Sequence, residues 1–595
     1  MAKSKDKYTF LLQEYDQALK KLRFNRNLLT IAKVVLFAAL CYMIYKWVNT
    51  AEMTYGFITV VSVISYLILN KIESGILNKI DLFDALIYCA ENEIAYIEGN
   101  FSAFDKGEEY LDQEHAFAKD IDIFGESSLY QAINRCETPE GKDFLAKSLL
   151  YPSVVESEIS EKQKAIAELT ENIELCLNLR AEIRNHPVSR VDNESIEKWK
   201  NAPYFFSKSV LKYSVYVSNL IMLLLISGTL LSDLPFKFVS FWFVIQLGIS
   251  ILFNTRLTKS QNYLDAFIKG FGNYLFPVAL LRGKKFKSSI LTNIISVLFE
   301  KHNSEKEFSA LKSIMETLDS RGNLIATVLL DGLFMRDIHT MISLDKWKKK
   351  NVDAVEGWKN SISELEMLIS FAFYRFNNPK FCLPVFNNDI ILKSTGMAHP
   401  LMYSRNPVDN NLTIDHLHQF FIVTGANMSG KSTFLRAVAV NWILALCGSV
   451  VNAVSFEFKP MRLFTSMRTS DNLSSGTSYF HAEILRLKSL LEIAGNKEPI
   501  FVILDEILKG TNSHDKLNGS RRFMLKLLSL PTTGIIATHD LELGELEKDF
   551  PEDINNICFE VEYDDNNELI YDYKLRCGIS KNMNATFLLE KYGLV

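Results

Sequence analysis

A glycine-rich segment in the C-terminal third of the chain contains the residue types that bind phosphate. Residues 425–432 read Gly-Ala-Asn-Met-Ser-Gly-Lys-Ser, which satisfies the pattern G-x-x-x-x-G-K-S/T. The two glycines let the backbone wrap tightly, so that its N–H groups and the following helix N-terminus can surround phosphate oxygens. In this pattern Lys431 reaches the β- and γ-phosphates, and the hydroxyl of Ser432 ligates Mg²⁺. The candidate nucleotide-binding residues are Gly425, Ala426, Asn427, Met428, Ser429, Gly430, Lys431, Ser432 and Thr433.

Two apolar runs further along the chain end in residues that can act on a bound nucleotide. Residues 500–504 precede Asp505 and Glu506, and residues 534–538 precede His539. Asp505 fits the carboxylate that supports Mg²⁺ in such ATPases, and Glu506 is placed to polarise the attacking water as a general base. His539 is expected at the same sheet edge, where it could sense the γ-phosphate or the water. The predicted catalytic residues are Lys431, Glu506 and His539; the predicted Mg²⁺ ligands beside ATP are Ser432 and Asp505.

These groups require a mostly parallel sheet flanked by helices. Residues 420–424 form an apolar run directly before the glycine-rich segment, as expected of a buried strand. Beyond residue 377, short β-branched or aromatic runs alternate with helical patterns. Residues 81–200 and 257–376 show helical periodicity instead. The sequence therefore predicts a multidomain α and α/β protein, in which a helical core and lever region precedes a C-terminal P-loop α/β ATPase domain of the ABC type.

The amino-acid composition limits the classes of protein to which the chain can belong. With 595 residues, 48% of them hydrophobic and 23% charged, the chain is neither disordered nor collagen-like. The 65 basic and 70 acidic residues exclude a protein that is basic overall, so nucleic-acid binding must come from local patches. Residues 282–287 and 346–350 are the candidates. Such a basic run is most often a solvated face, a contact for anionic lipid headgroups is the natural alternative, and a contact with a phosphate backbone is the third option. The eight scattered cysteines indicate neither disulfides nor a zinc cluster and favour a reducing compartment.

The mean hydropathy of +0.05 is high for a chain this charged, and four apolar segments account for it. They span residues 28–47, 53–69, 213–231 and 238–253, which pair as two helical hairpins. Each is close to the length of about 20 residues that crosses a bilayer. Lys and Arg flank the hairpins and are almost absent from their turns, so the termini and the ATPase domain are expected on the cytoplasmic side of a four-span membrane protein. The alternative is two buried hairpins in a large soluble core.

Several motifs together resemble the MutS-type ATPases of DNA mismatch repair. They are TGANMSGKST at 424–433, DNLSSGTSYFHAE at 471–483, DEILKGTNSHD at 505–515 and ATHD at 537–540. Residues 121–150, 358–386 and 573–595 are also similar to the family, so the resemblance covers about residues 115–200 and 355–595. It implies ATP hydrolysis with Mg²⁺, DNA binding, and a homodimer in which Ser478 of one subunit completes the ATP site of the other.

The chain differs from the family pattern at positions that bear on function. Ala426 stands where the family often has Pro, Ser429 where it has Gly, and residues 508–509 where it has Gly-Arg. The mismatch-reading N-terminal domain has no counterpart, because an apolar hairpin takes its place. Two functions follow as alternatives: a membrane-tethered, DNA-engaging ATPase, or an ATP-driven machine that acts on the membrane or on a protein partner without DNA. The expected domains are 1–80 (first hairpin), 81–205 (helical core), 206–256 (second hairpin), 257–378 (lever-like helices) and 379–595 (ATPase).

Overall fold

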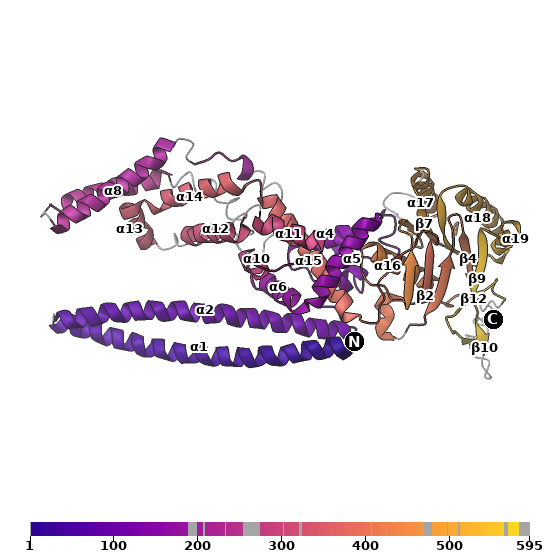
Figure 1. Cartoon of the computed structure of the whole chain (residues 1–595), viewed down its shortest axis with the longest axis horizontal. Coiled ribbons are helices and arrows are strands. Elements are labelled where there is room, and N and C mark those ends of the chain that lie inside the picture. Colours follow the sequence, from indigo (N-terminus) through magenta and orange to yellow (C-terminus); the bar gives the residue numbers. More distant parts are fainter. Residues whose placement is uncertain are drawn as a thin grey trace.

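Two helical arms extend in one direction from a helical middle region, and two β-sheets lie at the opposite end of the molecule (Figure 1). This arrangement is that of a computed structural model. It describes residues 2–50, 52–187, 199–205, 209–231, 234–253, 274–300, 303–319, 324–405, 407–468, 479–496, 498–509, 512–563 and 569–581. The prediction of a multidomain protein with helical and α/β parts is confirmed.

The first arm is an antiparallel hairpin of α1 (Ala2–Thr50) and α2 (Met53–Ile97). At 1.5 Å per residue, the 49 residues of α1 span about 74 Å. The base of the hairpin is buried against the middle region through side chains such as Tyr8, Leu11 and Leu86. The outer halves expose large apolar side chains instead, including Val34, Phe37 and Phe57. Both helices run well past the predicted apolar segments, and residue 80, where the sequence suggested a boundary, lies inside α2.

The second arm contains the other two apolar segments. They form α8 (Ser209–Leu231) and a helix over Lys237–Phe253. Trp242 and Gln246 join these helices, since Trp242 Nε1 donates to the Ser218 carbonyl oxygen at 3.1 Å and Gln246 Nε2 donates to Ser218 Oγ at 2.9 Å. The rest of this arm consists of α12 (Ser304–Asp319), α13 (Leu324–Phe334) and α14 (Arg336–Asn351).

Shorter helices make up the middle region around one long helix, α15 (Val355–Asn377). They are α3 (Leu129–Ile133), α4 (Pro139–Leu150), α5 (Glu156–Glu171), α6 (Ile173–Asn185), α10 (Leu275–Leu281) and α11 (Ser289–Ile295). The side chain of Thr138 caps α4 by accepting a hydrogen bond from the Gly141 N–H at 3.0 Å. Glu366 of α15 accepts hydrogen bonds from the N–H groups of Glu137 at 2.9 Å and Thr138 at 3.1 Å, which attaches this cap to the long helix.

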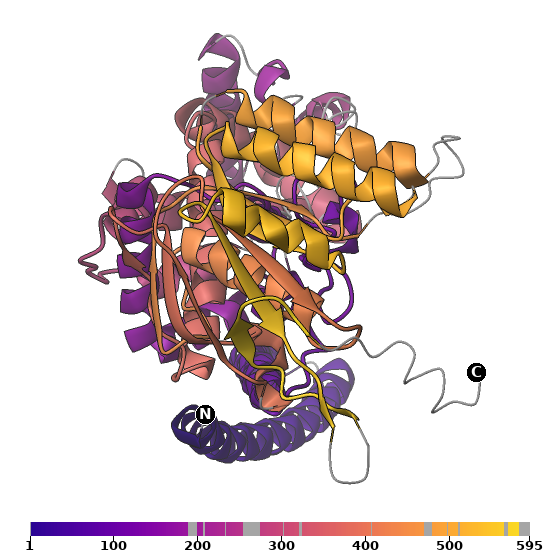
Figure 2. The same cartoon turned by 90° about the vertical axis from the view of Figure 1, so that its right-hand side faces the viewer.

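The C-terminal domain is built on a six-stranded sheet with the order β12-β9-β4-β8-β7-β6. All neighbours pair in parallel except β12 and β9. The strands are β4 (Phe420–Gly425), β6 (Arg462–Ser466), β7 (Ile500–Asp505), β8 (Thr532–Ala537), β9 (Ile554–Phe559) and β12 (Leu575–Cys577). The helices of this domain are α16 (Lys431–Leu446), α17 (Tyr479–Ala494), α18 (Ser513–Leu528) and the short α19 (Leu546–Asp549). α17 and α18 lie side by side at the end of the molecule opposite the arms (Figures 1 and 2).

A second sheet of mixed direction was not predicted from the sequence. Its order is β1-β5-β2-β3, and β10 and β11 form a separate two-stranded ribbon. The strands are β1 (Val385–Phe386), β2 (Leu392–Met397), β3 (Asn410–Ile414), β5 (Ser455–Phe458), β10 (Glu562–Tyr563) and β11 (Leu569–Ile570). β1 of this sheet and both strands of the ribbon have only two residues each, which is too short for a periodic sequence signal.

The basic cluster at residues 346–350 is not a uniformly solvated face. Trp347 is buried and its Nε1 donates to the Glu307 carbonyl oxygen at 2.8 Å. Lys348 is also buried, and its Nζ donates to the Ala202 carbonyl oxygen at 2.6 Å. Lys350 pairs with the carboxylate of Glu307. Because these side chains hold α14 to its neighbours, they are poor candidates for a phosphate or lipid contact.

Candidate active site

The glycine-rich segment forms the turn between β4 and α16. Gly425 and Gly430 have φ angles of 153° and 104°, which residues with a side chain rarely adopt. A Cβ on Gly425 would lie 2.8 Å from the carbonyl oxygen of Phe559, and one on Gly430 would lie 3.0 Å from the ring of Tyr573. Both the backbone conformation and the close neighbours therefore require glycine at these two positions.

Lys431 is the first residue of α16, and its side chain folds back over the turn. Its Nζ donates hydrogen bonds to the carbonyl oxygens of Gly425 at 2.7 Å and Ala426 at 2.9 Å. Burial lowers the pKa of Lys431 to about 8, although the carboxylates of Asp505 and Glu506 oppose that shift. The amine is partly withdrawn from water here, so an anion would be a stronger partner for its charged form than two carbonyl groups.

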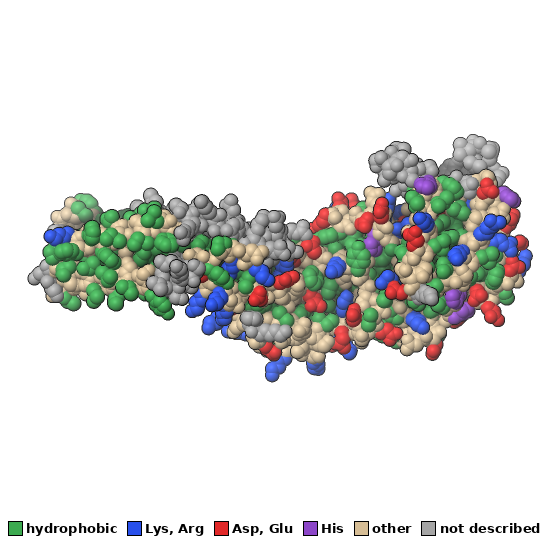
Figure 3. Space-filling view, turned by 90° about the horizontal axis from the view of Figure 1, so that it is seen from above, with side chains coloured by type: hydrophobic (Ala, Val, Ile, Leu, Met, Phe, Trp, Pro, Cys, Tyr) green, Lys and Arg blue, Asp and Glu red, His purple; other side chains and the backbone are tan. Residues whose placement is uncertain are grey.

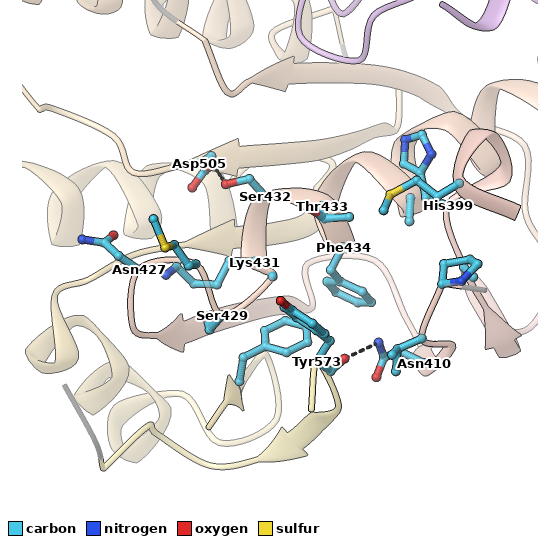
Figure 4. A pocket seen from close by; sticks show the side chains of 18 of the residues that line it. His399, Asn410, Asn427, Ser429, Lys431, Ser432, Thr433, Phe434, Asp505 and Tyr573 are labelled. Atoms are coloured by element: carbon cyan, nitrogen blue, oxygen red, sulfur yellow. Dashed lines mark hydrogen bonds between the residues drawn. The ribbon is translucent and has the colours of Figure 1, made fainter. Parts of the chain in front are cut away.

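Ser432 faces the end of β7. Its Oγ donates a hydrogen bond to Oδ2 of Asp505 at 2.6 Å (Figure 4). The sheet register explains this contact, because β8 lies between β4 and β7 and its Ala537 pairs with Val423 on one side and Asp505 on the other. The carboxyl ends of the three parallel strands therefore meet at one edge, where the glycine-rich turn begins.

Glu506 follows Asp505 in an uncommon backbone conformation, with a φ angle of 52°. Its N–H donates to the carbonyl oxygen of Ala537 at 2.8 Å, which holds the turn against β8. The carboxylate pairs with Lys516 at 3.1 Å and Lys509 at 3.4 Å. Burial alone would raise the pKa of Glu506, but these two ammonium groups hold it below its ordinary value. Glu506 is therefore ionised at neutral pH.

His539 lies just beyond β8, on the same side of the sheet as the other groups. Burial lowers its pKa below the ordinary value, and the ammonium group of Lys431 lowers it further. The imidazole is therefore mainly neutral at pH 7, so it can both donate and accept a hydrogen bond. A neutral ring beside Lys431 and Glu506 suits a sensing or orienting role better than that of a fixed charge.

One cavity of about 620 Å³ brings most of the predicted residues together. The predicted residues that line it are Asn427, Met428, Ser429, Gly430, Lys431, Ser432, Thr433, Asp505, Glu506 and His539. Gly425 and Ala426 lie directly below, where their carbonyl groups bind Lys431. Ser478 lies outside the described residues. The structure thus gathers on one surface a lysine, two carboxylates, a hydroxyl and an imidazole that come from the ends of three strands.

The cavity also contains residues to which the sequence gave no role. Tyr573, Asn410 and His399 line the side away from Asp505 (Figure 4). Asn410 Nδ2 donates to the Tyr573 carbonyl oxygen at 3.0 Å, and Asn410 Oδ1 accepts from the Leu575 N–H at 2.7 Å. Burial lowers the pKa of His399 to about 4, so its ring is neutral. Asn410 lies on β3 of the second sheet, His399 follows β2 and Tyr573 precedes β12, and no spacing rule connects these residues to the glycine-rich turn.

Glu483 on α17 is a further residue that the sequence did not single out as functional. Its side chain is buried, and its carboxylate accepts hydrogen bonds from the N–H groups of Leu508 at 2.6 Å and Lys509 at 3.1 Å. Leu508 has a φ angle of 60°, so the chain after Glu506 is held in a conformation that bulky residues avoid. Glu483 thus fixes the turn that carries Glu506.

Comparison with known proteins places this arrangement in a family. Residues 421–587 match MutS domain V, and residues 113–199 match MutS domain III. This chain is a member of the MutS family. The domain V match contains the whole of the site described above except the residues contributed by the second sheet. The domain III match covers α3 to α6 of the middle region.

The relatives share only part of their length with this MutS-family chain. It is 31% identical to MutS protein homolog 4 of Homo sapiens over 234 residues, which cover 38% of this chain and 24% of that protein. It is 32% identical to the DNA mismatch repair protein MutS of Fusobacterium nucleatum over 240 residues, or 39% of this chain and 26% of that protein. It is 26% identical to the DNA mismatch repair protein MutS of Thermotoga maritima over 499 residues, or 76% of this chain and 60% of that protein. The match spans less than two thirds of each of these relatives.

Proposed function

We propose that the chain is an ATPase that binds and hydrolyses ATP in the cavity at the ends of β4, β7 and β8. The observation that carries the proposal is the contact of 2.6 Å between Ser432 and Asp505, beside Lys431 and Glu506 on one cavity wall. A hydroxyl and a carboxylate next to a lysine in a glycine-rich turn are the groups that a nucleoside triphosphate with its metal ion requires.

In this proposal the turn at residues 425–432 surrounds the phosphates with its N–H groups, as the N-terminus of α16 favours negative charge. Lys431 exchanges its two carbonyl partners for the β- and γ-phosphates. Tyr573 and His399, at the other side of the cavity, offer ring faces for the nucleobase. The cavity volume of about 620 Å³ is within the usual range for a site of this size.

The residues present fit a Mg²⁺ ion that arrives with the nucleotide. Within the described residues, no group of three His, Cys, Asp or Glu side chains could hold a metal ion alone. Mg²⁺ is commonly held by one or two protein oxygens together with substrate phosphates and water. Ser432 and Asp505 supply two such oxygens, and the ion would neutralise charge on the phosphates.

Glu506 is the proposed general base. Its ionised carboxylate takes a proton from water while the water oxygen bonds to the γ-phosphorus, and the bond from that phosphorus to the β,γ-bridging oxygen breaks to release ADP. The base must first loosen its pairs with Lys516 and Lys509 to face the water. His539 would orient the water or report on the γ-phosphate.

A homodimer is part of the proposal, with Ser478 of each subunit completing the ATP site of the other. ATP binding would then close the subunit contact and hydrolysis would open it. A role related to DNA mismatch repair is supported by the names of the two bacterial MutS relatives. If the chain has such a role, its affinity for DNA should change when ATP binds and should fall steeply as the salt concentration rises.

Anchoring in a membrane is the second part of the proposal. The helices α1 and α2 are long and apolar enough to cross a membrane by length and composition. Both arms point the same way, away from the sheets (Figure 1). At this shared end, the face of the second arm seen in Figure 3 is mostly hydrophobic, and the first arm exposes large apolar side chains such as Val34 and Phe37. On that face, Lys and Arg side chains lie between this end and the C-terminal domain (Figure 3). This supports four spans that enter one bilayer from the side on which the ATPase domain lies, the cytoplasmic side.

The shared apolar end also favours a second function, in which the ATPase cycle acts on the membrane or on a protein partner without DNA. Filter-binding of duplex DNA across a salt series, with and without ATP, separates the two. Binding that depends on ATP supports the DNA role, whereas no binding even at low ionic strength leaves the membrane or protein role.

The ATPase proposal is tested with Glu506→Ala and Lys431→Ala in the detergent-purified full chain. We expect Glu506→Ala to bind ATP but to lose at least 100-fold in turnover, and Lys431→Ala to lose ATP binding. Glu498→Ala is the matched control, because Glu498 is an exposed carboxylate that precedes the strand whose far end carries Glu506. Unchanged turnover in Glu506→Ala would remove the assigned base.

A further inference from the structure

A second, larger cavity lies where the first arm joins the middle region. It has a volume of about 1010 Å³ and shares no lining residue with the cavity at the glycine-rich turn. The start of α1, the junction of α5 and α6, the loop after α10 and the end of α15 all contribute to its walls. Four basic side chains line it: Lys3, Lys7, Lys284 and Arg375.

About half of this positive charge is not neutralised by the carboxylates that line the cavity, Glu171 and Glu174. Lys7 pairs with Glu174. Among the described residues, neither Lys3 nor Lys284 has an ion pair, and the carboxylate acting on Arg375 is that of Glu171. Besides the pair of Lys7 and Glu174, three basic groups thus face the cavity against the one carboxylate of Glu171. A cavity with this excess of cations attracts anions.

Arg375 points to the same kind of ligand. Its Nη1 atom is buried and has no hydrogen-bond partner among the described residues. Burial lowers the pKa of this guanidinium group, an effect that Glu171 opposes only in part. A buried donor without an acceptor is costly, and a guanidinium group is suited to a phosphate because it can donate two parallel hydrogen bonds. Nη1 itself has almost no accessible surface, so a phosphate in the cavity would meet the other N–H groups of Arg375, which lines the cavity.

We propose that this cavity binds a phosphorylated small molecule of nucleotide size. Arg375, Lys284 and Lys3 would hold its phosphates, while apolar side chains such as Phe376, Phe381 and Leu383 would contact its organic part. A membrane headgroup is disfavoured by position, since Lys3 lies about 38 Å along α1 from residue 28, where the apolar stretch begins.

A ligand here would bridge two different parts of the chain. Lys3 belongs to the first arm, whereas Arg375 lies at the end of α15, the helix that comes directly before the first strand of the C-terminal region, β1. Binding would therefore strengthen the attachment of α1 to the entrance of that domain. A phosphorylated ligand would in this way link the position of the arm to the state of the ATPase domain.

The test is calorimetric titration of inorganic pyrophosphate into the full chain in detergent, without divalent cations, in a Lys431→Ala background. That substitution removes phosphate binding at the first cavity, so the result does not depend on ATP hydrolysis. We expect binding at one site, weakened at least tenfold by Lys284→Gln and by Arg375→Gln. Lys285→Gln is the matched control, because Lys285 is the exposed neighbour of Lys284 and does not line the cavity.

Two results would overturn the proposal. One is the absence of pyrophosphate binding in the Lys431→Ala background. The other is equal weakening by Lys284→Gln and Lys285→Gln, which would indicate diffuse attraction rather than a site. Since Lys284 is exposed, its substitution tests the proposal even where Arg375→Gln lowers stability.

Discussion

At the scale of single residues, we expect the affinity for ATP to depend on pH through the amine of Lys431. Its pKa is about 8 in the free protein, well below the ordinary value for lysine, because it is buried. Phosphates favour the ammonium form, so the pKa rises when ATP binds. Above pH 8 binding must therefore take up a proton, and the affinity should fall by up to tenfold per pH unit. His539 does not titrate in this window, since its pKa is lowered.

This prediction is measured as the ATP dissociation constant between pH 7 and 9.5 in the Glu506→Ala background, which prevents turnover. Proton uptake appears as a binding enthalpy that varies with the ionisation enthalpy of the buffer. In Lys431→Arg the side chain stays charged, so the slope above pH 8 should vanish. A constant affinity across the range would contradict the role given to this amine.

Glu483 is expected to position Glu506 without contacting ATP. In Glu483→Gln the carboxylate becomes an amide with one acceptor, so one of the hydrogen bonds to Leu508 and Lys509 is lost. We expect kcat to fall about tenfold, as for one charge-assisted hydrogen bond, while KM for ATP stays unchanged. Glu492→Ala, an exposed residue on the same helix, should alter neither constant. A raised KM with normal kcat would instead place Glu483 in substrate binding.

Some residues of the candidate site can be predicted from the sequence and others cannot, depending on whether neighbouring residues in the chain reveal their role. The turn at 425–432 and the strand-end groups Asp505, Glu506 and His539 are readable from sequence because each follows an apolar run. The roles of Tyr573 and Asn410 cannot be predicted from the sequence, because these residues come together only when distant elements pair. The ion pairs that restrain Glu506 depend in the same way on the position of α18, which carries Lys516.

At the scale of elements, one buried carboxylate fixes the first arm to the middle region. Glu93 of α2 is fully buried and accepts hydrogen bonds from Arg135 at 2.9 Å, Arg180 at 2.8 Å and Asn377 at 2.7 Å. Removing it in Glu93→Ala leaves two buried arginines without this partner. We expect a loss of about 3–5 kcal/mol in the free energy of unfolding.

The matched control is Glu98→Ala, at the C-cap of α2. Glu98 pairs with Lys5 at 2.8 Å, but both side chains are about half exposed. Its removal should cost less than about 1 kcal/mol, as is usual for surface pairs. Denaturant unfolding of both variants in detergent measures the difference. Equal losses would show that the buried network does not hold the arm.

Helices can be predicted from the sequence where their hydrophobic pattern extends over many residues. Helical periodicity and apolar length indicated the two hairpins, and α1, α2 and α8 contain the predicted segments. The second sheet was missed because its short strands are defined by partners far away in the chain. The cluster at 346–350 looked exposed because charge alone carries no information on packing, yet Lys348 lies over the rings of Trp199 and Tyr204.

At the scale of the whole molecule, the common direction of the two arms gives the membrane proposal its geometry. The hairpin turn of the first arm lies at the end farthest from the sheets (Figure 1). Lys33, a charge within the first apolar segment, pairs with Glu73 of the opposite helix at 2.5 Å, and both side chains are only 16% exposed. Pairing of this kind lowers the cost of placing a charge near lipid.

Native cysteines allow this geometry to be tested in cells that make the full chain. Cys41 lies in the outer half of α1 and Cys577 on β12, and both are exposed in the fold. A membrane-impermeant maleimide should label Cys577 only after permeabilisation, and it should not label Cys41 in either case because the bilayer covers it. In a Thr50→Cys variant, the new thiol at the hairpin turn should react in intact cells. Labelling of Cys41 as fast as that of Cys577 would mean that water surrounds the arm, and then the exposed apolar side chains of α1 would require a protein partner instead of lipid.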